Sequence, residues 1–157
     1  MVDIEKLFAR ASEAFQQNKY DYAITMFVDI LKLDPNHVKS HQILRVACIR
    51  KCEEKGYQGK LSAMMQRTKI QGQCAVTKDP DSRLKLCQDF LINNPHDEWI
   101  RLAMARAYRD KGAMDGSIAE FEIVFGANGS SVAAAKALGE LYADKKDFKK
   151  AQDYFQI

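Results

Sequence analysis

The feature that most constrains the fold is an internal repeat of 34 residues. Two sets of side chains recur at that offset, namely Met104, Ala105 and Tyr108 followed by Leu138, Gly139 and Tyr142, and Met114, Ser117 and Phe121 followed by Phe148, Ala151 and Phe155. The segment Tyr20, Ala23 and Phe27 carries the second pattern near the N-terminus. A fixed period of this length indicates stacked supersecondary units.

Each unit predicts two α-helices. Apolar residues recur at helical spacing, as in Leu7, Phe8, Ala11, Ala14 and Phe15. Helix-ending and helix-capping residues fall between the periodic segments, at Pro35, Pro95, Gly112, Ser131 and Asp147. Small residues, Ala23, Ala105, Gly139 and Ala151, would let paired helices approach closely, while Phe27, Phe121 and Phe155 would fill the space between pairs. The expected class is all-α.

The repeated pattern closely resembles the tetratricopeptide repeat (TPR) family, most fully in Leu138, Gly139, Tyr142, Phe148, Ala151 and Phe155. The resemblance implies a right-handed α-α superhelix of about four helix pairs within a single domain, 1–157. It also implies a non-catalytic protein-interaction scaffold. The predicted units lie near 4–37, 38–97, 98–131 and 132–157, the last of them truncated.

The second unit departs from the pattern. Pro35 and Pro95 end corresponding helices but lie 60 residues apart rather than 34, which leaves 26 extra residues at about 55–79. Within this insert, Leu61, Met64 and Met65, with Ile70, are expected to share one face of a short amphipathic helix. That helix would pack back as a satellite core, or would offer a stripe for docking a partner.

Positive charge gathers around the insert. The window 45–78 holds eight Lys and Arg against two Glu, whereas the whole chain carries +3. The basic-patch candidates are Arg50, Lys51, Lys55, Lys60, Arg67 and Lys69. A solvated loop is the favoured interpretation, and an acidic protein partner or nucleic acid are the alternatives. Nucleic acid is the least favoured, because Tyr57 is the patch's one aromatic residue and stacking platforms use several.

Neither a cofactor nor a metal is expected. His37, His41, Cys48 and Cys52 lie on one helical stripe, but residues 41 and 48 are about 10 Å apart along a helix, too far to share one zinc ion. The cysteines lack the spacing of a disulfide framework and are expected to be reduced. No histidine belongs to a nucleophile-and-acid motif, so the chain is expected not to be an enzyme.

The N-terminus lacks the pattern of a signal peptide, and no apolar run approaches the roughly 20 residues that span a bilayer. These features predict a cytoplasmic protein without membrane contact.

In the TPR family the first helices of successive units line a concave groove that holds a peptide or a helical segment. The resemblance implies that this groove contains Phe8, Phe15, Gln42, Val46, Ile49, Trp99, Leu102, Arg106, Arg109, Lys136 and Glu140. One TPR subclass grips a C-terminal carboxylate with Lys, Arg and Asn. Phe8 and Ser12 replace the first Lys and Asn of that clamp, so the expected ligand is instead an amphipathic segment with acidic residues.

The last helix is expected to stop before its second apolar turn, since only Gln156 and Ile157 follow Phe155. Repeat arrays need a terminal element with a polar outer face. The chain is therefore expected either to continue in a longer repeat protein or to associate with another copy through its C-terminal end.

Overall fold

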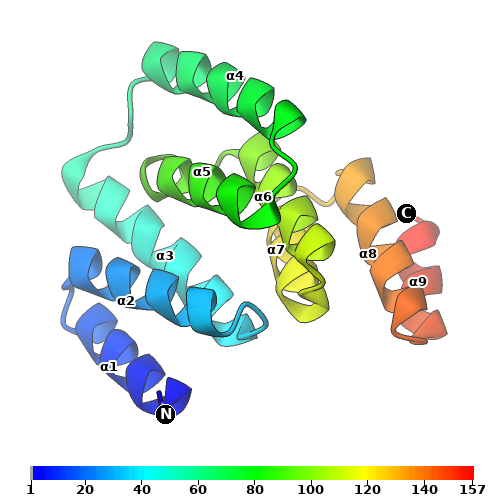
Figure 1. Cartoon of the computed structure of the whole chain (residues 1–157), viewed down its shortest axis with the longest axis horizontal. Coiled ribbons are helices and arrows are strands. Elements are labelled where there is room, and N and C mark those ends of the chain that lie inside the picture. Colours follow the sequence, from blue (N-terminus) through cyan, green and yellow to red (C-terminus); the bar gives the residue numbers. More distant parts are fainter. Residues whose placement is uncertain (1) are drawn as a thin grey trace.

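The computed structural model describes residues 2–157, and this part of the chain is all α-helical, without strands. Its helices are α1 (Ile4–Gln16), α2 (Tyr20–Leu33), α3 (Val38–Lys55), α4 (Lys60–Val76), α5 (Pro80–Asn93), α6 (Glu98–Lys111), α7 (Met114–Ala127), α8 (Val132–Asp144) and α9 (Phe148–Phe155). The chain runs from α1 at the lower left of Figure 1 to α8 and α9 on the right, and consecutive helices pack on one another except α3 and α4. The all-α superhelical fold predicted from the repeat is confirmed.

Capping residues set several helix boundaries. The carboxylate of Asp97 accepts a hydrogen bond from the backbone N–H of Ile100 at 2.9 Å, and Ser131 and Asp147 cap α8 and α9 in the same way. Such caps satisfy N–H groups that have no partner inside the helix. Gly112 ends α6 with a φ of 87°, a left-handed conformation that glycine adopts without strain. The predicted caps at Gly112, Ser131 and Asp147 are confirmed.

Three apolar cores follow one another along the array. The first joins α1, α2 and α3, the second joins α4, α5 and α6, and the third joins α6 to α9. Phe27 and Phe121 are fully buried, as expected for side chains that fill the space between pairs. Phe155 differs, because 55% of the residue is exposed. It lies against Gly139, where an added Cβ would overlap its ring.

The predicted insert contains the 17-residue helix α4, and the face it buries differs from the expectation. Ala63 and Ile70 are buried against α5 and α6, whereas Leu61, Met64 and Met65 are exposed. At about 100° per residue, positions 63 and 70 nearly coincide around the helix, and 61, 64 and 65 lie on other sides. Ile70 therefore does not share a face with the other three.

Insertion of α4 changes how the second predicted unit packs. Helix α3 contacts α2 along one side and reaches α7 and α5 on the other, while α5 packs mainly on α6. The loop between α3 and α4 rests on the turn between α5 and α6, where the side-chain amide of Asn94 donates to Gln58 at 2.7 Å. The division of the chain into four repeat units remains a prediction. No helix within residues 2–157 is long and apolar enough to cross a membrane.

Candidate functional site

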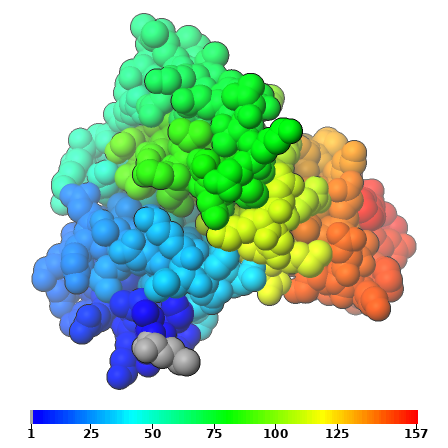
Figure 2. Space-filling view, viewed as in Figure 1, coloured from blue at the N-terminus to red at the C-terminus, as the bar shows by residue number. Residues whose placement is uncertain are grey.

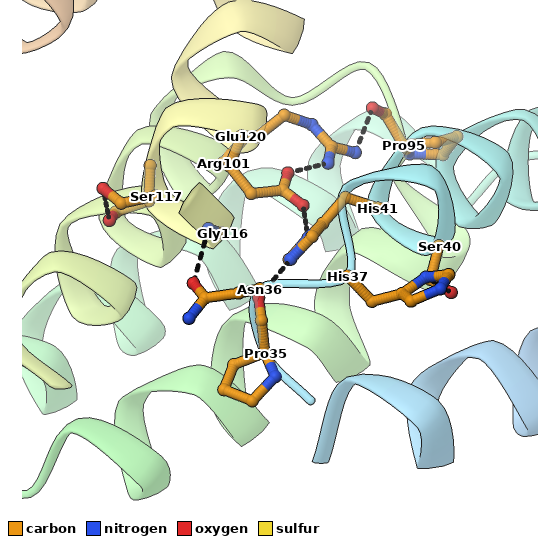
Figure 3. Close-up of polar contacts among 11 residues, drawn as sticks. Pro35, Asn36, His37, Ser40, His41, Pro95, Arg101, Gly116, Ser117 and Glu120 are labelled. Atoms are coloured by element: carbon orange, nitrogen blue, oxygen red, sulfur yellow. Dashed lines mark hydrogen bonds and ion pairs between the residues drawn. The ribbon is translucent and has the colours of Figure 1, made fainter. Parts of the chain in front are cut away.

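A buried ionic cluster joins three helices, α3, α6 and α7. The carboxylate of Glu120, on α7, contacts His41 of α3 through one oxygen and Arg101 of α6 through the other, each at 2.7 Å. All three side chains are buried. We call His41, Arg101 and Glu120 the Glu120 cluster (Figure 3). It joins helices far apart in sequence and so determines how α3 lies relative to α6.

His41 and Arg101 make equivalent contacts in their two units. The Nε2 of His41 donates to the carbonyl of Pro35 at 2.7 Å, and the guanidinium of Arg101 donates to the carbonyl of Pro95 at 3.0 Å. Each side chain thus reaches back six residues to satisfy the carbonyl of the proline before its own helix. Both turns are held against α7 through the same carboxylate (Figure 3).

The geometry of the cluster defines the protonation state of Glu120. Burial raises the pKa of Glu120, but the charge of Arg101 and the hydrogen bond from His41 outweigh it and hold this pKa below its ordinary value. Glu120 is therefore a carboxylate. The two ring nitrogens of His41 both face oxygen acceptors, Nδ1 the carboxylate of Glu120 and Nε2 the carbonyl of Pro35, each at 2.7 Å.

A second arginine, Arg45, stands beside the cluster. Arg45 of α3 lines a cavity of about 230 Å³ together with Arg101 and residues from the start of α6 and the end of α7. Burial, then repulsion from Arg101, lowers the pKa of Arg45, while Glu120 opposes this shift. Its Nε is buried without a hydrogen-bond partner. The carboxylates of Asp97 and Glu98 also line this cavity, beside Arg45 and Arg101.

The predicted groove residues divide by exposure. On the surface of α3, α6 and α8, the exposed side chains are Gln42, Val46, Trp99, Arg106 and Lys136. The partly buried ones are Phe8, Phe15, Ile49, Arg109 and Glu140. Leu102 departs from the expectation, because it is buried in the core shared by α6, α7, α8 and α9 and presents no surface to a ligand.

Some of these residues meet across neighbouring first helices. The guanidinium of Arg109 donates to the carboxylate of Glu140 at 3.1 Å, which links α6 to α8. Arg50 of α3 lies over the ring of Phe15 of α1, 4.9 Å from its centroid. One of these contacts joins two groove candidates on α6 and α8, and the other joins the groove candidate Phe15 of α1 to a basic-patch candidate of α3.

Several basic-patch candidates are already neutralised. Lys55 forms an ion pair with Asp21 at 2.6 Å, Lys51 lies 3.9 Å from the same carboxylate, and Arg67 contacts Asp97 at 2.5 Å. Arg50 stacks on Phe15. Lys60 and Lys69 are exposed and join none of the ion pairs formed by residues 2–157.

The described residues contain no group of three or more His, Cys, Asp or Glu side chains that could hold a metal ion. His41 is committed to Glu120, and Cys48 and Cys52 are buried. Burial raises the pKa of the Cys48 thiol to about 12, which disfavours the thiolate that a metal needs.

We therefore expect the native protein to hold no zinc and to keep its thiols reduced. Elemental analysis of untagged protein, with thiol titration under denaturing conditions, tests this. Stoichiometric zinc would contradict it.

Sequence reasoning missed Arg45, Arg101 and Glu120. The available signal was a charge between two apolar neighbours, as for Glu120 between Ala119 and Phe121, and Glu122 shows the same pattern without being buried. Charged residues are almost never fully buried unless paired, so such positions indicate a buried ion pair.

Solved structures of MamA share the fold. One MamA crystal structure aligns with 93% of this chain and 90% of its own, at 17% identity and a TM-score of 0.55. A second covers 98% and 88%, at 16% identity and a TM-score of 0.54. MamA residues 41 to the end from Desulfovibrio magneticus RS-1 align with a TM-score of 0.47, at 17% identity over 98% of this chain and 72% of that one. No family model and no curated protein matches the sequence.

The structures with TM-scores above 0.5 define the class of the fold, a TPR-like helical solenoid. At this level of identity the likeness extends to the fold alone. The resemblance that the 34-residue repeat carries in the sequence and the arrangement of the helices thus agree.

Proposed function

We propose that the protein is a non-catalytic interaction scaffold that binds a peptide or helical segment of a partner on the surface of its first helices. The observation that carries this proposal is Trp99, which is 66% exposed on α6. Arg106 lies two turns further along the same face and is also exposed. Trp and Arg are enriched among the residues that dominate binding energy. An amphipathic segment with acidic groups would satisfy both side chains.

The Glu120 cluster supports this proposal by fixing α3 against α6 and α7 in the unbound protein. A preformed surface loses less conformational entropy on binding than a mobile one. A cytoplasmic location fits four cysteines without the spacing of a disulfide framework. In this proposal the protein needs no cofactor.

Trp99→Ala and Arg106→Ala are each expected to weaken partner binding by about 2 kcal/mol, near 30-fold in Kd. Partners retained by the intact protein are identified by mass spectrometry, purified, and titrated against each variant. Tyr22→Ala is the matched control, because Tyr22 is an exposed aromatic residue on α2, a second helix. Circular dichroism should remain unchanged in all three variants. If deletion of 57–78 abolishes binding while both substitutions leave it intact, the surface of the first helices is not the binding site.

We also propose that the α8–α9 end contributes to self-association. Phe148, Phe155 and Ile157 are all exposed there, and soluble monomers rarely leave large apolar patches open. Sedimentation velocity should show an oligomer that Phe148→Glu converts to monomer. A strict monomer at high protein concentration would contradict this part of the proposal.

A further inference from the structure

Helix α4 has a second apolar face that none of the described residues, 2–157, covers. Its inner face is satisfied, because Ala63 and Ile70 are buried against α5 and α6. On its outer side Leu61, Met65 and Val76 are 68%, 65% and 80% exposed, and Met64 beside them is 51% exposed. In the space-filling view α4 forms the outer surface at the top of the molecule (Figure 2).

The exposed apolar side chains lie along one side of α4, with Thr68 and Gly72 between Met65 and Val76 on that side. At about 100° per residue, Leu61, Met65 and Val76 fall within about 60° of one another around α4 and lie roughly opposite Ala63 and Ile70. The stripe runs for about 22 Å along the helix axis, at 1.5 Å per residue. Gly72 lies on the same side, and no atom would stand within 4 Å of a Cβ added there. This surface matches a partner helix of roughly 15 residues.

Uncompensated positive charge borders the stripe. Residues 55–78 include five Lys and Arg and no Asp or Glu. Other helices neutralise two of these cations, since Lys55 pairs with Asp21 and Arg67 pairs with Asp97. Lys60 and Lys69 are exposed and take part in no ion pair among residues 2–157. By the helical period they flank the stripe on its two sides.

We propose that the outer face of α4 is a second docking surface, which binds an amphipathic helix of a partner protein whose apolar stripe is bordered by Asp and Glu. Apolar side chains would cover Leu61, Met65 and Val76, while carboxylates on either side would meet Lys60 and Lys69. Methionine suits such a surface, because its unbranched thioether chain adapts to irregular partners. This surface lies outside the groove of first helices and does not depend on it.

The composition of the stripe favours a protein over a membrane or a nucleic acid. Helices that lie in a bilayer interface use Trp, Phe and Leu with many basic residues, and the α4 stripe has no aromatic residue and two free lysines beside it. Binding of single-stranded nucleic acid relies on several stacked aromatic side chains, and Tyr57 is the one aromatic residue of the insert.

A charge-swap experiment tests the proposal on the full chain. The probes are two fluorescent 18-residue helical peptides with the same Leu stripe, one bordered by Glu and the other by Lys, titrated by fluorescence anisotropy. Wild-type protein should prefer the Glu peptide by at least about tenfold, and Lys60→Glu with Lys69→Glu should reverse that preference. Met65→Glu should weaken binding of the Glu peptide by about tenfold. These residues are exposed, so the unfolding midpoint should not change.

The matched control is Lys39→Glu with Lys149→Glu, which changes the net charge equally at exposed positions on α3 and α9. The control should keep the wild-type preference. The proposal would be overturned if the charge-swap variant and the control variant changed the preference between the two peptides equally. It would also be overturned if the wild-type protein bound both peptides with equal affinity. Two further results would overturn the proposal. One is that the protein binds phosphatidylserine vesicles more tightly than the Glu peptide and that Met65→Glu abolishes this vesicle binding. The other is that Met65→Glu abolishes self-association measured by sedimentation.

Discussion

Gly116→Ala is expected to lower the free energy of unfolding by about 3 kcal/mol, at the upper end for an overpacked core. A Cβ at this position in α7 would lie closer to the backbone carbonyl oxygen of Pro35 than Cβ atoms approach, and 3.2 Å from the Nε2 of His41. Backbone cannot move aside as the end of a flexible side chain can. The N–H of Gly116 also donates to Asn36 at 3.0 Å, which fixes the turn in place (Figure 3).

Gly72→Ala provides the matched control, because Gly72 lies inside α4 and an added methyl group would enter open space. Alanine is favoured over glycine within a helix by roughly 0.5–1 kcal/mol, so this variant should be more stable than wild type. Urea denaturation followed by circular dichroism measures both changes. If both substitutions changed the free energy of unfolding by equally small amounts, the carbonyl of Pro35 would not lie as close to residue 116 of α7 as described.

Glu120→Gln is expected to destabilise the protein by about 3–5 kcal/mol, the cost of breaking a buried ion pair. The amide keeps the size of the side chain but leaves the guanidinium of Arg101 buried without a balancing charge. Glu140→Gln is the control, since the pair of Glu140 with Arg109 is partly exposed and such pairs contribute about 1 kcal/mol or less. A loss for Glu120→Gln no larger than that of the control would contradict the assigned role of the cluster.

The Glu120 cluster also predicts that the free energy of unfolding depends on pH in the acid range. The folded-state pKa of Glu120 lies below its ordinary value, so its contribution is present above the unfolded pKa of about 4.3 and is lost as pH falls through the folded pKa. Below about pH 4.3, the free energy of unfolding of wild type should therefore fall more steeply than that of Glu120→Gln. Parallel pH profiles would show that Glu120 does not carry this linkage.

Local patterns in the sequence determined much of the fold. The 34-residue period, the helical spacing of apolar residues and the caps at Gly112, Ser131 and Asp147 depend on contacts within a few residues. The orientation of α4 could not be predicted in the same way. Its sequence has two apolar faces, one with Ala63 and the other with Leu61 and Met65, and only the packing surface offered by α5 and α6 selects between them.

The Glu120 cluster could not be predicted from the sequence either, because it depends on contacts between distant segments. Glu120 and His41 are 79 residues apart, and they meet because α3 packs against α7. A strict 34-residue register gives no reason to place α3 there. The exposure of Trp99 and the burial of Leu102 on one helix likewise depend on where α7 and α8 lie.

The contact between α3 and α7 has a consequence for cooperativity. In a repeat array, stability is approximately a sum over units and their nearest-neighbour interfaces, so one end can fray while the other stays folded. Here a buried carboxylate on α7 is hydrogen-bonded to a residue of α3, and detaching α1 to α3 would leave Glu120 without one of its two partners. The N-terminal helices and the middle of the array are therefore expected to exchange their amide hydrogens as one unit, while α9 opens independently at lower free energy.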